Sequence, residues 1–211
     1  AAFGMAYRLL EGAMGGMHEH WTLMLSVLAA LSLAVGNLFA IAQSNLKRML
    51  AYSTISHIGF MLLGFVNGTA EGFAAAMFYM ICYALMATVA FGVIMVLARA
   101  GFEAEEIDDF KGLNQRNPWY AGIMAISMFS LAGVPPLFGF FAKLMVLKVV
   151  IDAGQLWLAI VAIIFAIIGL FYYLRVVKVM YFDAPLDDGP LVLPTDHSFR
   201  WALSLNGLAL L

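Results

Sequence analysis

A single lysine, Lys143, lies inside a long apolar stretch that covers residues 119–151. No charged residue occurs between Trp119 and Ala142. A charge at the centre of a membrane helix costs roughly 2.5–3.5 kcal/mol, so an ionisable residue in such a stretch marks a functional site by default. The alternative is snorkelling towards Ile151, over roughly 12 Å at 1.5 Å per residue. We predict that Lys143 binds and releases protons.

The same stretch contains residues that interrupt a helix. Gly133, Pro135 and Pro136 precede Lys143, and Gly139 lies between the prolines and the lysine. Proline has no backbone N–H and clashes with the preceding turn. Interrupted backbone at membrane depth is tolerated only where protein covers it or water fills a cavity beside it. We predict non-helical backbone from Gly133 to Gly139, lining a wet cavity, which is typical of an ion pathway.

A second group of polar residues lies in the segment NLKRMLAYSTISHIGF, residues 45–60. Ser53, Ser56 and His57 are spaced so that they share one face of a helix, and Tyr52 pairs with Ser56 in the same way. A polar stripe with a histidine can pass protons through side chains and ordered water. The alternative is that these groups only form hydrogen bonds between helices.

Lys47 has two interpretations as well. It stands beside Arg48 at the start of an apolar run, which is typical of an ordinary cytoplasmic anchor. As part of a relay it would need to be desolvated. A cluster of Tyr172, Tyr173 and basic residues near Tyr181 is also typical of an interfacial anchor.

Nothing in the chain predicts a bound cofactor or metal ion. Cys82 is the only cysteine, and there is no glycine-rich phosphate loop and no haem attachment motif. His18 and His20 flank a glutamate, but two histidines at this spacing are a weak metal signal.

Composition gives the class of protein. Hydrophobic residues make up 64% of the chain, charged residues make up 11%, and the mean hydropathy is +0.94. Soluble domains carry about 25% charged residues. The chain is therefore an integral membrane protein, and its net charge of −2 argues against a nucleic-acid partner.

Hydropathy predicts an all-α, polytopic transmembrane helix bundle with one discontinuous helix. The expected spans are 21–43, 47–66, 73–98, the broken segment 119–151 with halves 119–132 and 137–151, and 155–177, with partial spans at 1–10 and from 199. A span needs about 20 residues, so we expect one transmembrane domain over residues 1–211 that is truncated at both ends.

The distribution of basic residues indicates that the broken segment crosses the membrane once. In that arrangement only Arg8 and Lys148 lie on one side. The other side would hold Lys47, Arg48, Arg99, Lys111, Arg116, Arg175, Lys178 and Arg200. A re-entrant hairpin would divide them more evenly, and the positive-inside rule favours the uneven division with the lysine-rich side cytoplasmic.

Four segments resemble the antiporter-like subunits of respiratory complex I. GNLFAIAQSNLKRMLAYSTISHIGF (36–60) resembles their central signature, and DDFKGLNQRNP (108–118) resembles the loop before their broken helix. SLAGVPPLFGFFAKLMVL (130–147) resembles the broken helix itself, and YYLRVVKVMYFDAP (172–185) is similar to the subunit N branch. Subunits of multi-subunit cation/proton antiporters and membrane-bound hydrogenases share this fold.

The resemblance implies half of an inverted-repeat antiporter-like fold and a proton channel along a hydrated axis. Lys143 matches the lysine of the broken helix, Lys47 matches a lysine that lies near the central axis in the family, and His57 matches a position that is often histidine. Lys47 and His57 would form a lateral relay from Lys143, with Ser53, Ser56 and water bridging roughly 15 Å along the helix. The family's first half-channel uses a glutamate and a lysine on earlier helices, which this chain does not contain.

The resemblance also implies a setting. The chain would work in a bacterial inner membrane, in contact with lipid and with other membrane subunits of NADH-quinone oxidoreductase. NADH, FMN, iron–sulfur clusters and quinone would be bound elsewhere in that complex, and quinone reduction would supply the energy. The alternatives are a cation/proton antiporter without a redox link and a purely structural scaffold, which would gain little from a buried lysine.

Overall fold

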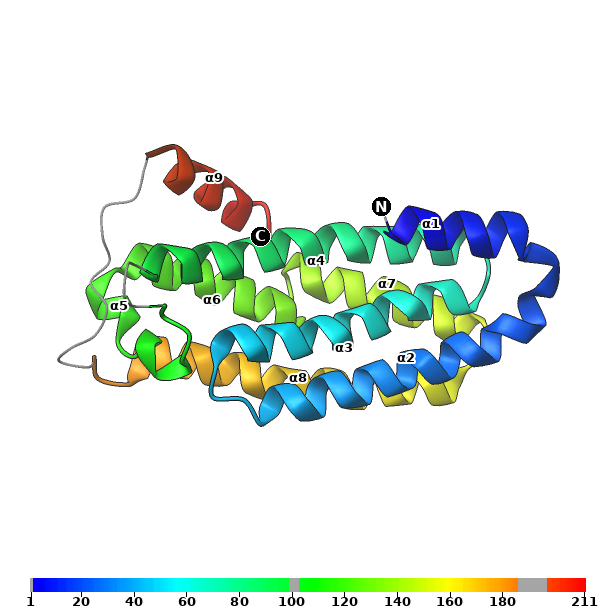
Figure 1. The fold of residues 1–211 in the computed structure, drawn as a ribbon, viewed down its shortest axis with the longest axis horizontal. Helices are drawn as coiled ribbons and strands as arrows, with labels where there is room; N and C mark the ends of the chain where they lie inside the picture. The colour runs from blue at the N-terminus through cyan, green and yellow to red at the C-terminus, as the bar shows by residue number, and fades with distance from the viewer. Residues whose placement is uncertain (1, 99–102, 186–196) are drawn as a thin grey trace.

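The computed structural model describes residues 2–98, 103–185 and 197–211. These residues form an elongated helical bundle (Figure 1), and the β pairing within them is an isolated antiparallel bridge between Asn45 and Glu106. The helices are α1 (Ala2–Tyr7), α2 (His18–Ile41), α3 (Leu46–Val66), α4 (Ala70–Leu97), α5 (Leu113–Arg116), α6 (Pro118–Ala132), α7 (Phe138–Asp152), α8 (Leu156–Phe182) and α9 (His197–Leu208). A π-helical segment, Arg8–Ala13, continues α1 beyond the predicted partial span, and Ile107–Phe110 forms a 3₁₀ turn.

Four of the described helices, α2, α3, α4 and α8, are long and apolar enough to cross a membrane. They agree with the predicted spans to within a few residues, except that α8 continues to Phe182 instead of ending near residue 177. The prediction of an all-α, polytopic bundle is confirmed.

The predicted broken segment consists of two short helices that run end to end along α4. Figure 1 shows α6 beside one half of α4 and α7 beside the other half, and both helices pack against α4. The segment therefore traverses the bundle once and does not fold back as a hairpin.

The turns gather at two ends of the bundle. At one end, Arg175 of α8 donates to the Gln43 carbonyl at 3.1 Å, and the Gly112 N–H donates to the Val179 carbonyl at 3.2 Å. At the opposite end, Lys148 lies 3.2 Å from Glu71. The predicted division of basic residues follows from this arrangement, with the exception of Arg99, which lies outside the described residues.

Local sequence signals explain where these helices begin. The side chains of Asn45, Thr69 and Asn117 accept a backbone N–H from the first turn of α3, α4 and α6 respectively. Asparagine and threonine are favoured at this position because the first turn leaves N–H groups without helical partners. Pro118 follows Asn117 at the first helical position, where no N–H is needed.

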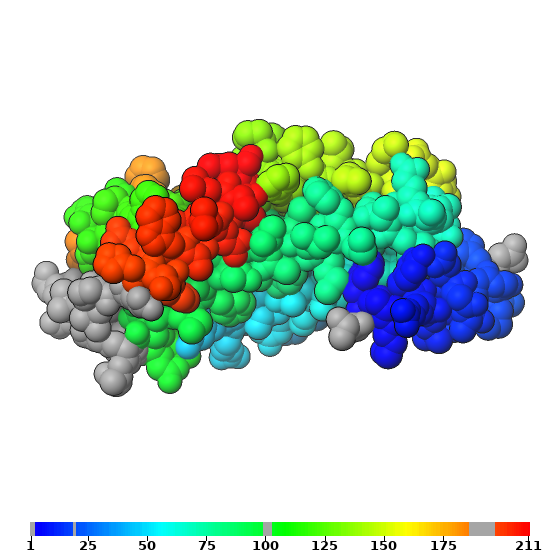
Figure 2. Space-filling model, turned by 90° about the horizontal axis from the view of Figure 1, so that it is seen from above, coloured from blue at the N-terminus to red at the C-terminus, as the bar shows by residue number. Residues whose placement is uncertain are grey.

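Helix α9 lies on one outer face of the bundle. Figure 2 shows α9 and the N-terminal segment over separate parts of this face, with α4 between them. The carbonyl of Leu210, just after α9, accepts the N–H of Phe138 at 3.3 Å. The end of α9 therefore touches the start of α7, close to the interruption.

Candidate functional site

The interruption between α6 and α7 is the first part of the candidate site. Helix α6 ends with Gly133 in the left-handed region, at φ 87°, and α7 begins at Phe138. The Val134 N–H bonds to the Phe129 carbonyl and the Gly133 N–H to the Ser130 carbonyl, as in a Schellman motif. Glycine reaches this conformation without the steric cost that other residues incur.

The predicted extent of the interruption was wrong at its far end. Gly139 is already helical, as the second residue of α7. It is needed for close packing, because a Cβ at this position would overlap the backbone carbonyl of Ser130. The Ser130 hydroxyl also accepts the Gly139 N–H at 3.1 Å, so one hydrogen bond and close packing hold the two half-helices together at Ser130.

Lys143 occupies the hydrogen-bonding gap that the prolines leave. In a continuous α-helix the carbonyls of Leu131 and Ala132 would accept the N–H groups of residues 135 and 136. Both of those residues are proline and have no N–H. The Lys143 amine donates instead, to Leu131 at 3.0 Å and to Ala132 at 2.8 Å.

The amine is enclosed by the protein. Lys143 is only 8% exposed, and a Cβ on Gly133 would lie 2.9 Å from its side-chain Cδ. Pro135 and Pro136, in contrast, lie on the outer surface of the described chain. The lysine therefore caps the carbonyl end of α6 from inside the bundle, where the helix dipole favours a positive charge.

His57 is the second part of the site, and it lies near the middle of α3. Its Nδ1 atom is 2.8 Å from the hydroxyl of Tyr79 on α4, and its Nε2 atom is 3.0 Å from the hydroxyl of Tyr173 on α8. The ring of Tyr83 packs against the imidazole, with centroids 4.7 Å apart. A single buried histidine thus connects three membrane helices through both ring nitrogens.

The other residues of the predicted polar stripe have different surroundings. Ser53 and Ser56 are buried on the same side of α3 as His57. Ser53 donates to a carbonyl one turn earlier, and Ser56 accepts from Asn37 of α2 at 2.7 Å. Tyr52 stacks on Phe39 at 5.5 Å and, among the described residues, has no hydrogen bond to the His57 network.

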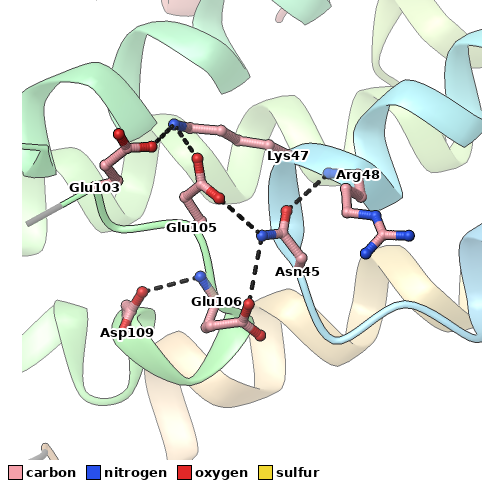
Figure 3. Close-up of polar contacts among 7 residues, drawn as sticks. All are labelled: Asn45, Lys47, Arg48, Glu103, Glu105, Glu106 and Asp109. Carbon is pink, nitrogen blue, oxygen red and sulfur yellow. Dashed lines mark hydrogen bonds and ion pairs between the residues drawn. The ribbon is translucent and has the colours of Figure 1, made fainter.

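The resemblance implied that Lys47 lies near the central axis, and this placement was wrong. Lys47 is in the first turn of α3 at one end of the bundle, and its side chain is 37% exposed. It lies 2.7 Å from Glu105 and 3.5 Å from Glu103, which belong to the acidic loop before α5 (Figure 3). The turn after Ile41 places the beginning of α3 at the end of the bundle, so solvent and loop carboxylates can reach the amine.

Asn45 completes the contacts between the acidic loop and α3. Its amide donates to the carboxylates of Glu105 and Glu106, at 3.1 Å and 3.3 Å (Figure 3). The hydrogen bond from Lys47 is the main reason why the pKa of the Glu105 carboxyl is lowered to about 2. Despite these carboxylates, the described part of the chain holds no group of three or more His, Cys, Asp or Glu side chains placed to bind a metal ion.

A chain of aromatic contacts separates Lys143 from His57. The Lys143 amine lies 5.3 Å from the ring centroid of Phe60, and Phe60 stacks on Tyr79 at 5.8 Å. Tyr79 is the residue that bonds to His57 Nδ1. The two ionisable groups are neighbours within the core, but an apolar ring lies on the path of contacts between them.

The sequence interpretation missed the tyrosines of this site. Tyr172 and Tyr173 are 2% and 1% exposed, so their assignment to an interfacial anchor was wrong. Tyr79 had no sequence signal beyond its place in an apolar span. The adjacent pair of tyrosines two residues before Arg175 could have been recognised, since a buried phenol needs a hydrogen-bond partner.

Comparison with known proteins agrees with this arrangement. The family described as "NADH:quinone oxidoreductase/Mrp antiporter, TM" matches residues 1–169. A protein named NADH-quinone oxidoreductase subunit N from Xanthomonas euvesicatoria pv. vesicatoria is 59% identical over 211 residues, which are 100% of this chain and 43% of that relative. The chain thus spans less than half the length of this relative.

Two solved structures have the same fold. A chain of respiratory complex I from Thermus thermophilus with bound Aureothin gives a TM-score of 0.79 at 32% identity, over 89% of this chain and 42% of that chain. A chain of the Mrp complex from Dietzia sp. gives 0.82 at 27% identity, over 92% and 36%. The chain therefore belongs to the antiporter-like family of transmembrane subunits that NADH:quinone oxidoreductases and Mrp antiporters share.

Proposed function

We propose that this chain is part of a proton-translocating subunit of NADH-quinone oxidoreductase, corresponding to subunit N, and that Lys143 holds and passes the proton. One observation carries the proposal. The buried Lys143 amine bonds to the two carbonyls that Pro135 and Pro136 leave without helical partners. A buried amine at the break of a membrane helix is a feature of ion pathways.

The surroundings of Lys143 act on its charge in opposite directions. Burial disfavours the ammonium form, whereas the carbonyl end of α6 favours it. A change in hydration or in a nearby charge can therefore shift the balance between binding and releasing a proton. Movement of one charge against 100 mV costs roughly 2.3 kcal/mol, so such a site must be gated and cannot remain open to both sides.

The proposed route leads from Lys143 to His57. Because Phe60 lies on the path of contacts, transfer requires internal water or a rearrangement of this ring. Ser53 and Ser56 support the same buried face of α3. Lys47 is left out of the route, because it pairs with Glu105 at the end of the bundle.

The energy and the remaining components come from the rest of the complex. NADH, FMN, iron–sulfur clusters and quinone are bound by other subunits, and this chain contacts neighbouring membrane subunits and the lipid of a bacterial inner membrane. The names of the relatives and the match to a complex I chain support this setting. An upstream half-channel completes the pathway in the longer subunit.

Substitution of Lys143 in the complete complex tests the proposal. Positioned acid–base groups contribute roughly 10²–10⁴-fold to proton transfer, so Lys143→Ala is expected to reduce proton pumping about 100-fold, together with the coupled quinone reductase turnover. Lys143→Arg is expected to restore little, because a guanidinium does not release its proton in the working range. The matched control is Lys148→Ala, since Lys148 is exposed and paired with Glu71. Wild-type pumping by Lys143→Ala would overturn the proposal.

A second candidate function is cation/proton antiport without a redox link. The match to a chain of an Mrp complex favours it. The two functions differ in their dependence on sodium. Proton uptake that follows NADH oxidation in sodium-free vesicles supports the redox-driven pump, whereas uptake that requires a sodium gradient supports the antiporter.

A further inference from the structure

The two tyrosines that flank His57 have a role beyond packing. We propose that Tyr79 and Tyr173 relay the proton to and from His57, so that the proton passes between α4 and α8 through the imidazole. This inference rests on the proposed function, because it concerns the continuation of the same pathway. It adds two hydroxyl groups, neither of which lies on the helix that carries His57.

The number of donors and acceptors on the imidazole determines which phenol donates a hydrogen bond to it and which phenol accepts one. A neutral imidazole has one N–H donor and one lone-pair acceptor. Both ring nitrogens face a phenol hydroxyl, at 2.8 Å for Tyr79 and 3.0 Å for Tyr173. One phenol must therefore donate to the ring while the other accepts from it. When the tautomer changes, the two phenols exchange these roles.

The neighbouring hydroxyl groups do not have this freedom. Thr54 donates its single proton to the Leu50 carbonyl at 2.9 Å, so the Tyr83 hydroxyl, 2.6 Å from Thr54, must be the donor in that contact. Tyr83 packs its ring against His57, but its proton is directed to Thr54. The Tyr83 hydroxyl therefore lies near His57 without bonding to it, unlike the hydroxyls of Tyr79 and Tyr173.

Tyr172 is fixed in a similar way. Its hydroxyl donates to the side-chain oxygen of Asn37 at 3.1 Å. The Asn37 amide nitrogen uses its two protons on the Leu33 carbonyl and the Ser56 hydroxyl, at 2.8 Å and 2.7 Å. The hydrogen bonds of Tyr172 and Asn37 therefore hold α2, α3 and α8 together. Among the described residues, only Tyr79 and Tyr173 bond to the imidazole.

One transfer can be written with all protons balanced. An internal water molecule carries a proton from the Lys143 ammonium to the Tyr79 oxygen, and the original Tyr79 proton moves to His57 Nδ1, which gives an imidazolium. The Nε2 proton then moves to the Tyr173 oxygen, and the original Tyr173 proton passes to an internal water molecule, which becomes a hydronium ion. In the first stage an O–H bond and the Nδ1–H bond form while the old Tyr79 O–H bond breaks. In the second stage an O–H bond forms on Tyr173 while the Nε2–H bond and the old Tyr173 O–H bond break, and all three residues end neutral. His57 has changed tautomer and must return before the next transfer.

The contacts at the ends indicate the direction of the relay. Tyr79 stacks on Phe60, whose ring lies beneath the Lys143 amine, so the Tyr79 end faces the proposed proton donor. Tyr173 belongs to α8 and touches the Tyr172 ring at 4.5 Å, on the far side of His57 from α4. The path therefore runs across the bundle, from α4 through His57 of α3 to α8.

Removal of single hydroxyl groups in the complete complex, reconstituted in vesicles, tests the relay. Proton transfer by positioned groups contributes roughly 10²–10⁴-fold, and water can replace part of it, so Tyr79→Phe and Tyr173→Phe are each expected to lower proton pumping about tenfold. Tyr83→Phe is the matched control and is expected to pump normally. Because the phenols act through His57, neither substitution should cause much further loss in a His57→Gln background.

The results separate this inference from the function on which it rests. If Lys143→Ala stops pumping while Tyr79→Phe and Tyr173→Phe behave like Tyr83→Phe, the relay is wrong and the proposed function stands. If Lys143→Ala pumps normally, the proposed function fails and the relay fails with it. The relay would also be overturned if Tyr79→Phe or Tyr173→Phe lowered pumping in the His57→Gln background as much as in the wild type. Such additive losses would indicate that the tyrosine has a structural role.

If a phenylalanine variant does not assemble, an unnatural amino acid at the same position provides a second test. Fluorotyrosine at position 79 or 173 keeps the ring and the hydroxyl but makes the phenol more acidic. The relay then predicts that the pH profile of pumping shifts to lower pH, whereas the same replacement at position 83 leaves the profile unchanged. An unshifted profile at positions 79 and 173 would contradict the relay.

Discussion

The Lys143 amine has a structural role at the helix break, and the proposed function gives the same amine a chemical role. It fills the hydrogen bonds that Pro135 and Pro136 cannot make, and under the proposed function it is the buried group that binds the proton. Each carbonyl left unsatisfied costs roughly 1–3 kcal/mol, so removal of the amine also destabilises the break. Subunit content in the membrane must therefore be measured beside pumping in every Lys143 variant.

Gly139 offers a separate test of the break. We expect Gly139→Ala to destabilise the subunit by about 1–3 kcal/mol, because the new methyl group would push against the Ser130 backbone. The measurement is the thermal unfolding temperature of the complex in detergent. Gly122→Ala is the matched control, since Gly122 lies in α6 with no atom within 4 Å of the new Cβ. Equal unfolding temperatures for the two variants would show that the half-helices are not closely packed there.

At the scale of elements, the acidic loop holds the start of α3. The Leu46 N–H donates to the Glu105 carbonyl at 2.6 Å, and the Ile107 N–H donates to the Ser44 carbonyl at 2.9 Å. The side chains of Lys47 and Asn45 add contacts to the same loop (Figure 3). The turn between α2 and α3 is thereby joined to the segment that leads into α5 and α6.

The depressed pKa of Glu105 makes this junction depend on pH. The carboxyl has a pKa of about 2 in the folded chain against an ordinary value of 4.5. Its stabilising contribution is therefore fully present above about pH 4.5 and is lost as the pH falls towards 2. We expect hydrogen exchange at Leu46 and Ile107, corrected for the intrinsic rate, to accelerate over that interval.

The Glu105→Gln variant should show the faster exchange already at neutral pH. Glu103→Gln is the control and should have a smaller effect, because Glu103 is 76% exposed and farther from Lys47. Exchange in Glu105→Gln that equals the wild type would mean that the backbone bonds alone hold the loop.

At the scale of the whole molecule, the bundle has two polar ends and apolar sides. Exposed apolar residues cover much of α2 and α8, including Leu23, Leu31, Leu38, Ile160, Ile167 and Phe171. In a soluble protein such faces would promote aggregation, whereas in a membrane they contact lipid or neighbouring subunits. The single traverse of α6 and α7 sets which loops lie on each side.

Labelling of introduced cysteines tests this topology. Asp108→Cys and Glu71→Cys place thiols at opposite ends of the bundle, and the native side chains are both 66% exposed. An impermeant maleimide is expected to label Asp108→Cys from the cytoplasmic side and Glu71→Cys from the other side. The buried Cys82 should be replaced by alanine in both variants. Labelling of both positions from one side would contradict the single traverse.

The sequence alone determined the class, the spans and the interruption of this chain. Apolar runs of membrane length can satisfy their backbone only as helices, so hydropathy predicted α2, α3, α4 and α8 closely. Pro135, Pro136 and Gly133 limit the backbone locally, so the break was also predictable. The role proposed for Lys143 rests on a charge that an apolar stretch otherwise excludes.

Only the tertiary structure decided what each polar group touches. Residues 79 and 173 belong to different helices, and no spacing along the chain indicates that both bond to His57. Lys47 was misplaced because the course of the α2–α3 turn, and not its local sequence, sets how far the amine lies from the core. Gly139 was misjudged because its packing against Ser130 depends on where two half-helices meet. Contacts between helices arise from the packing of whole elements, and a residue's own neighbours in the sequence do not specify them.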